Sequence, residues 1–248
     1  MANLLPELIP LIISDRATSL ALALVNKQYN DIVTPILYKV IFLNGIDAIK
    51  AFSDTMTSGH PKLCQYPTYL RIYERPVHFS WDGTDPDNLI PVLKQVLMHV
   101  PNLSDLTLQV TEPIVHYIID EPRYPFKLRR LEMPPVRGAI FAEFLRTQPE
   151  IEHISLWGRP DLGGSLIDTT PLQPDILPKL RLIEGDTTSI SIIVPLRPVT
   201  EVAGTAGKFD RVSNVPGRFR GSWARLQMFS KAQVLLEIVA EVFTVDLA

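Results

Sequence analysis

The segment LSDLTL, Leu103–Leu108, contains the apolar pattern L-x-x-L-x-L, which returns three more times along the chain. Successive copies begin 25, 23 and 26 residues apart. A repeat of this length is typical of proteins in which each unit contains a strand and a covering helix and buries its apolar faces only against its neighbours. The four copies are Leu103/Leu106/Leu108, Leu128/Leu131/Met133, Ile151/Ile154/Leu156 and Leu177/Leu180/Leu182.

Weaker copies extend the pattern in both directions. Each copy predicts a strand whose apolar side chains point into the protein, while the intervening side chains point outward and are available to a ligand. The outward candidates are Asp105, Thr107, Arg130, Glu132, His153, Ser155 and Arg181. The weaker copies are Leu70/Ile72, Val199/Val202, Trp223/Leu226/Met228 and Val242/Val245/Leu247.

Helical periodicity separates the predicted strands. In residues 86–99, 138–150 and 230–243, apolar side chains recur every three or four positions, so the repeating unit is strand, loop, helix, loop. Pro86 after Asp85 is a typical helix start, and Ser230 is a typical N-cap. The apolar positions are Leu89, Leu93, Val96 and Leu97, then Ile140, Phe141, Phe144 and Leu145, then Val234, Leu235, Ile238, Val239 and Val242.

The N-terminal sixty residues are predicted to contain three helices and one β-rich run at residues 37–43. Pro10 kinks or starts the first helix, and Pro35 is expected to end or bend the second, because proline lacks the N–H of a helical hydrogen bond. Gly59 is expected just past the end of the third helix. The apolar faces are Leu5, Leu8, Ile9 and Ile12, then Val25, Tyr29, Ile32, Val33 and Ile36, then Ile46, Ile49, Phe52 and Met56.

Composition excludes several classes of protein. With 248 residues and 46% hydrophobic residues, the chain can bury a core. A net charge of −3 argues against binding nucleic acid over the whole surface. The single cysteine, Cys64, cannot form an internal disulfide, so we expect a reducing compartment, the cytoplasm or nucleus. Glu7, Asp15 and Arg16 interrupt the apolar N-terminus, which fits neither a signal peptide nor a membrane span.

Two N-terminal segments resemble an F-box, LPELIPLII at residues 5–13 and ALALVNKQYNDIVTPILYKVIFL at residues 21–43. The second has tyrosine where tryptophan is commoner. Together with the repeats that follow, they make the chain similar to the F-box/leucine-rich-repeat proteins abundant in mushroom-forming (basidiomycete) fungi. The matching residues are Leu5, Pro6, Glu7, Leu8 and Ile12, then Leu22, Val25, Lys27 and Tyr29.

The chain departs from the family pattern at several positions. One residue is missing between Pro6 and Glu7, and the connection SDRATS between the helices is short. The asparagine that normally follows each leucine pattern is replaced, so we expect irregular repeats. The replacing residues are Thr111, Val136, Arg159 and Gly185.

The resemblance implies a substrate-recognition subunit of a Skp–cullin–F-box ubiquitin ligase, which is not itself an enzyme. Its N-terminal helices would bind a Skp-type adaptor, and through it a cullin, while the repeats would bind a protein substrate. Two alternatives remain: the helices cap the end of the repeat stack, or the chain is a repeat scaffold with no link to ubiquitin. The expected adaptor-binding residues are Leu5, Pro6, Leu8, Ile12, Val25 and Tyr29.

We expect an α/β chain with three parts: an F-box-like helical module at 1–43, a linking helix and loop at 44–65, and an irregular leucine-rich-repeat domain at 66–248. Residues 197–225 are expected to be disturbed, as in a truncated or mis-spliced family member. Basic and aromatic side chains in 208–225 suit either RNA stacking or a flexible insertion, and we expect no nucleic-acid partner.

Catalytic, cofactor and metal sites are not predicted. The histidines, His60, His78, His99, His116 and His153, lack metal-binding spacing, although His153 on a strand could contact a ligand. The segment GTAGK at 204–208 lacks the spacing of a phosphate-binding loop, and DGTDPD at 82–87 lacks that of a calcium loop. We therefore expect no cofactor and no metal.

Overall fold

The computed structural model divides into two compact units, with the boundary between Arg129 and Arg130. Both units combine α-helices with strands that pair in parallel, which confirms the predicted α/β class at this level. The structure describes residues 16–58, 62–73, 86–121, 123–136, 139–156, 172–173, 175–185 and 187–204.

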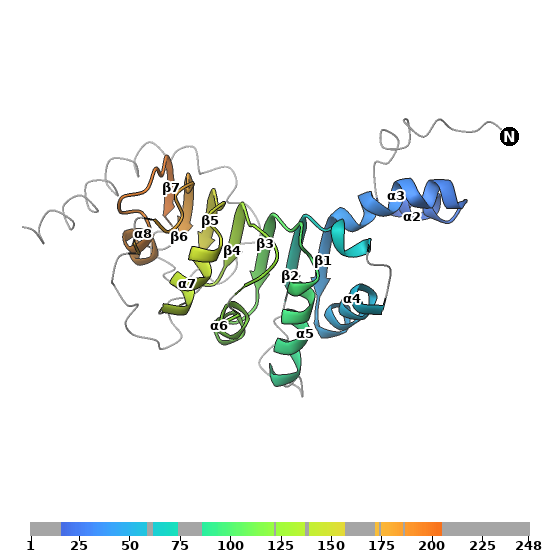
Figure 1. Cartoon of the computed structure of the whole chain (residues 1–248), viewed down its shortest axis with the longest axis horizontal. Helices are drawn as coiled ribbons and strands as arrows, with labels where there is room; N and C mark the ends of the chain where they lie inside the picture. Colours follow the sequence, from blue (N-terminus) through green and yellow to red (C-terminus); the bar gives the residue numbers. More distant parts are fainter. Residues whose placement is uncertain are drawn as a thin grey trace, which may run out of the picture. The chain divides into compact units, whose positions relative to one another are not determined.

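The first unit contains a sheet in the order β1-β2-β3, which follows the order of the chain. Helices α4, α5 and α6 lie along one side of these strands (Figure 1), where α4 contacts α5 and α5 contacts α6. The elements are α2 (Arg16–Ala23), α3 (Lys27–Lys39), β1 (Val40–Asn44), α4 (Ile46–Ser58), a 3₁₀ turn at Leu63–Gln65, β2 (Tyr69–Tyr73), α5 (Pro86–Met98), β3 (Asp105–Gln109) and α6 (Glu112–Ile119).

Alternate residues of the three strands form the core of the first unit. Leu70 pairs with Leu106 and Ile72 pairs with Leu108, and all four are buried. Burying a leucine or isoleucine stabilises the fold by about 1.5–3 kcal/mol, so these rows are a main source of stability. The partial copy predicted at Leu70/Ile72 is therefore a true member of the series.

Strand β1 extends this series by one further member. Ile41 and Leu43 pair with Leu70 and Ile72, and both are buried. The sheet thus begins at Val40, and the boundary predicted at residue 43 falls inside β1. The run predicted at 37–43 is helical up to Lys39 and extended only from Val40.

Helix α3 begins at a polar cap. Asn26 has extended backbone, and its Oδ1 accepts a hydrogen bond from Tyr29 N at 2.9 Å, which satisfies one of the free N–H groups of the first turn. Val25 precedes the helix, although it was predicted to lie within it. Pro35 does not end the helix, which continues to Lys39. The carbonyl that it leaves unpaired belongs to Asp31, which is exposed and open to water.

The other helix predictions agree with the structure over the described residues. The helix predicted at 86–99 is α5, and all four of its predicted apolar positions are buried. The helix predicted at 46–56 is α4, which ends at Ser58. Helix α6 was not predicted. The first predicted helix, with its face at Leu5–Ile12, and the last, at 230–243, lie outside the described residues.

The second unit contains a sheet in the order β4-β5-β6-β7, again following the chain. In β4 and β5, Leu131 pairs with Ile154 and Met133 with Leu156, and all four are buried as predicted. The elements are β4 (Arg130–Met133), α7 (Ala139–Thr147), β5 (His153–Leu156), β6 (Leu182–Gly185), α8 (Thr187–Ile193) and β7 (Glu201–Gly204).

The predicted fourth copy, Leu177/Leu180/Leu182, is in the wrong register. Ile154 pairs with Ile183, and Ile183 is fully buried while Leu182 is only half-buried. Since the side-chain period of a strand is two, a shift of one residue moves a side chain to the opposite face. The true copy therefore consists of Leu180, Ile183 and Gly185.

Glycine at the last position of this copy has a steric reason. A Cβ at Gly185 would lie 3.3 Å from Leu156 O and 3.5 Å from Leu156 Cβ, so a side chain there would require Leu156 to shift. The next strand keeps the corrected register, because Ile183 pairs with Val202 and Gly185 with Gly204. Val202 of the weak copy Val199/Val202 thus has the predicted register, although it is 36% exposed, while the two later copies lie outside the described residues.

The residues that precede neighbouring strands are joined by hydrogen bonds, which align the strands. Thr68 N donates to Lys39 O at 2.9 Å, and Ser104 N donates to Thr68 O at 3.0 Å. In the second unit, Thr200 N donates to Arg181 O at 2.9 Å. These bonds set the register at the start of each strand, so the loops that follow can vary in length.

Candidate binding surfaces on the strands and the N-terminal helices

The outward side of the first unit's sheet carries a cluster of aromatic side chains around one arginine. Alternation places residues 40, 42, 69, 71 and 73 on the side opposite to the buried rows. We call this cluster the aromatic–arginine face. Its members are Val40, Phe42, Tyr69, Arg71 and Tyr73.

Arg71 occupies the centre of this face. Its Cζ atom lies 4.6 Å from the centre of the Tyr73 ring, a cation–π distance, and it pairs across the sheet with Phe42. The rings of Phe42 and Tyr69 lie 5.8 Å apart in a tilted arrangement. Phe42 is 51% exposed, which is unusual for an aromatic side chain without a partner.

The guanidinium of Arg71 is not neutralised by the described part of the chain. No described residue forms a hydrogen bond or an ion pair with it, and its Nε–H is shielded from solvent without an acceptor. Asp105 is the nearest carboxylate along the sheet, yet it accepts a hydrogen bond from the hydroxyl of Ser104 at 2.6 Å. A positive charge with free donors therefore lies among aromatic rings.

The second unit carries a different outward row, which we call the acidic row. Register places His153 beside Arg130 and Ser155 beside Glu132, and it places Glu184 beside Ser155. Its members are Arg130, Glu132, His153, Ser155 and Glu184. Four of the five were predicted outward positions, so here the structure brings most of the candidates together.

Glu184 is held in its ionised form. The imidazole of His153 lowers the pKa of Glu184 against the opposing effect of burial, and the hydroxyl of Ser155 and the charge of Arg130 add to this. His153 Nε2 lies 3.7 Å from Glu184 Oε2, longer than a hydrogen bond and suited to an ion pair when the ring is protonated. The row is therefore charged near neutral pH.

Three predicted outward residues have different surroundings from those expected. Thr107 is only 2% exposed, so it cannot offer its hydroxyl freely to a ligand. Asp105 is half-buried and bonded to Ser104. Arg181 precedes β6, and its carbonyl accepts the hydrogen bond from Thr200 N. In the corrected register, the outward positions of β6 are Leu182 and Glu184.

The residues missed from sequence are the members of the aromatic–arginine face and Glu184. The signal for the first was available, because Tyr69, Arg71 and Tyr73 alternate with the buried Leu70 and Ile72. Glu184 was missed because the fourth copy was placed one residue out of register.

Apolar side chains are also exposed where α2 meets α3. Leu20 is 50% exposed, Leu24 86% and Val25 62%, whereas Tyr29 is half-buried. Leu24 and Val25 lie in the turn between the helices, and their N–H groups bond back to residues of α2. Of the predicted adaptor-binding residues, Val25 is thus available to a partner, while Leu5, Pro6, Leu8 and Ile12 lie outside the described residues.

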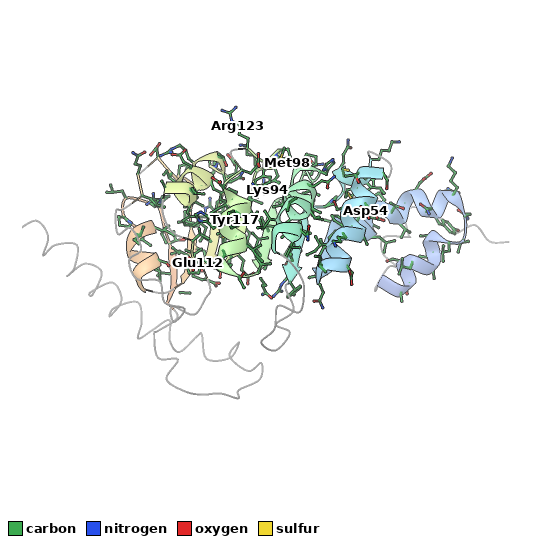
Figure 2. All side chains as sticks on the ribbon, turned by 90° about the horizontal axis from the view of Figure 1, so that it is seen from below. Asp54, Lys94, Met98, Glu112, Tyr117 and Arg123 are labelled. Carbon is green, nitrogen blue, oxygen red and sulfur yellow. The ribbon has the colours of Figure 1, made fainter. Side chains whose placement is uncertain are left out.

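The helical side of the first unit differs from both surfaces. Figure 2 shows Asp54, Lys94, Met98 and Tyr117 along this side. Met98 and Tyr117 are exposed, but Lys94 forms an ion pair with Glu121 at 3.4 Å nearby. Single exposed apolar residues among charged side chains are ordinary protein surface, so this side gives no candidate site.

Within the part of the chain that the structure describes, no three histidine, cysteine or acidic side chains lie close enough to bind a metal ion. No described helix has both the length and the apolar composition needed to cross a bilayer. Comparisons with family models, with curated proteins and with solved structures found no match to the chain.

Proposed function

We propose that the chain is an F-box/leucine-rich-repeat protein and acts as the substrate-recognition subunit of a Skp–cullin–F-box ubiquitin ligase in the cytoplasm or nucleus. The N-terminal helices bind a Skp-type adaptor, and the outward sides of the repeats bind a protein substrate. The proposal rests on the sequence resemblance together with the arrangement of apolar residues at the N-terminus.

The observation that supports adaptor binding best is the exposure of Leu20, Leu24 and Val25. Leucine and valine side chains that stay half or more exposed lose part of the roughly 1.5–3 kcal/mol that burial would give, so three of them within six residues favour a protein partner. Apolar side chains that become desolvated at the centre of an interface contribute most of its binding energy. Tyr29 follows in the first turn of α3 and is half-buried.

The repeat assignment is supported by the leucine positions of β1 to β7, which stay in register within each unit while the connecting segments differ in length. Each strand is followed or preceded by a helix that covers only one of its sides, as in a leucine-rich repeat. The other side remains open to a substrate.

Co-purification with a Skp-type adaptor tests the proposal. The wild-type chain is expected to retain the adaptor, and Val25→Asp and Leu24→Asp are expected to lose it, because each buries a charge at the interface. Leu196→Asp is the matched control, since Leu196 is equally exposed but lies in the second unit. Circular dichroism establishes that all three variants are folded.

If the wild-type chain fails to retain the adaptor while Val25→Asp and Tyr29→Ala change only stability, the alternative is favoured: a repeat scaffold without a link to ubiquitin. Adaptor retention that is equal in all variants would place the interface elsewhere on the chain and refute the assignment of these helices.

A further inference from the structure

The aromatic–arginine face has the dimensions of an extended peptide. Tyr69, Arg71 and Tyr73 are two residues apart along one strand, so their side chains are separated by roughly 7 Å, the spacing of alternate side chains in any extended chain. Phe42 lies on the neighbouring strand opposite Arg71. A peptide lying over this face therefore meets a charged group and an aromatic pair at matching intervals.

Charge decides what the centre of the face can bind. Arg71 has free N–H donors and no anionic partner among the described residues, while Tyr73 holds the flat guanidinium by a cation–π contact. Arginine in this state binds carboxylates with two parallel hydrogen bonds, and such charge-assisted bonds are the stronger kind. The complementary ligand group is an anionic side chain.

The exposed apolar side chains of the face indicate which ligand group lies beside the anion. Val40 and Phe42 are both exposed, and the Phe42 ring lies beside Tyr69. An aliphatic or aromatic ligand side chain placed over this pair would bury the exposed ring surface. The ligand must therefore carry an apolar side chain two residues away from its acidic side chain.

A single-stranded nucleic acid fits this face less well than a peptide does. Nucleic-acid affinity is built from several phosphate contacts, whereas the face offers one cation, and Asp105 lies on the adjoining strand. The whole chain also carries a net charge of −3. Stacking on tyrosine alone, without further cations, gives little affinity at ordinary salt concentration.

We infer that the aromatic–arginine face binds an extended peptide in which an acidic side chain lies two residues from an apolar or aromatic one. The acid pairs with Arg71, and the apolar side chain packs on Phe42 and Tyr69. This inference rests on the proposed function, because it names the class of substrate segment that the repeats recognise, but peptide binding is measurable without the adaptor.

The test uses the full chain and immobilised short peptides. One set carries glutamate two positions from leucine or phenylalanine, a second set replaces glutamate by glutamine, and a third replaces the apolar residue by serine. Binding to the first set is expected, with at least about tenfold weaker binding to the other two. The glutamine set loses a charge-assisted hydrogen bond, and the serine set loses about 1.5–3 kcal/mol of apolar burial, each of which corresponds to a factor of ten or more.

Variants assign the binding to this face. Arg71→Gln and Phe42→Ser are each expected to weaken binding about tenfold, whereas Arg181→Gln, which removes an exposed arginine in the second unit, is expected to leave it unchanged. Because Phe42 is half-exposed, its substitution keeps the fold even if that of Arg71 does not. All variants are expected to retain the Skp-type adaptor as the wild type does.

Equal binding of glutamate and glutamine peptides would overturn the inference, as would no binding to any set, or binding that Arg71→Gln and Phe42→Ser both leave intact. Preference for a single-stranded oligonucleotide over the peptides would also overturn it. Loss of adaptor retention by the wild type with peptide binding intact would refute the proposed function alone.

Discussion

Arg197 allows the sharpest test of how the second unit is held together. Only 9% of the surface of Arg197 is exposed, and its side chain donates hydrogen bonds to four backbone carbonyls. Burial lowers the pKa of this guanidinium, and Asp175 opposes that effect only partly. The acceptors are Ile176 O at 2.8 Å, Pro195 O at 2.9 Å, Gln173 O at 2.7 Å and Ile193 O.

Replacing Arg197 by methionine removes all four donors while keeping much of the volume. Hydrogen bonds to a charged group are worth about 1.5–3 kcal/mol each, so the gross loss is several kcal/mol. Methionine avoids the cost of burying a charge, which offsets part of that loss. We expect a net decrease in the free energy of unfolding of about 3–5 kcal/mol, because four carbonyls lose their donor at about 1–3 kcal/mol each before that offset.

Urea denaturation followed by circular dichroism measures this change, and hydrogen exchange in peptides from β6 and α8 locates it in the second unit. Arg197→Lys is expected to lose about half as much stability, because an ammonium has three donors and no planar fork. Arg181→Met, at an exposed arginine, is expected to change the free energy of unfolding by less than about 0.5 kcal/mol. An Arg197→Met variant as stable as Arg181→Met would refute the reasoning.

Three further predictions follow from local contacts. Gly185→Leu is expected to destabilise the second unit by more than about 2 kcal/mol through overpacking against Leu156, and Gly185→Ala by less, as measured by the urea midpoint; equal midpoints would contradict the steric argument. Because the pKa of Glu184 is lowered from 4.5, Glu184 adds stability above that value which is lost as pH falls through its lower folded pKa. Glu184→Gln should therefore lower the urea midpoint at neutral pH, and the difference from wild type should shrink as the pH falls below 4.5 and vanish once Glu184 is protonated in the folded protein; a difference that persists in acid would argue for a loss of packing. Asn26→Ala is expected to cost about 1 kcal/mol by removing the cap of α3, seen as faster amide exchange in its first turn, while Asn26→Ser should restore most of the protection.

The core of the fold could be predicted from sequence because buried strands and helices leave strict apolar periods. The patterns at Leu103–Leu108 and Leu128–Met133 identified both strands and their inward sides, and the spacing of Leu89 and Leu93 identified the covering helix. The strand at Val40–Asn44 was recognised as β-rich but not as a repeat, because it directly follows a helix with no loop between them.

The register of the fourth copy could not be predicted from sequence. The segment fits the repeat pattern in two ways, one that begins at Leu177 and one that begins at Leu180. Leu177 and Leu180 are both fully buried, yet Leu177 adopts a left-handed backbone with φ of 62° in the turn before the strand. The residue that decides between these two registers is Gly185, which has no side chain to count in an apolar pattern. Apolar periodicity therefore predicted the register with three leucines. In the structure the last position is Gly185, which lies close to Leu156.

The repeat pattern constrains only the inward apolar residues, so the outward side chains of the two units differ in charge. The aromatic–arginine face offers an unpaired cation, whereas the acidic row contains two carboxylates, of which Glu184 is kept ionised by its neighbours. An acidic peptide is thus attracted to the first unit, whereas the row of the second unit combines its two carboxylates with Arg130 and His153 and presents charges of both signs. Since discrimination is a difference between affinities, an anion that is bound at one unit and not at the other gives specificity. On the proposed function, an acidic segment of a substrate would then favour the first unit, and Arg71→Glu should abolish that preference without disturbing the buried rows.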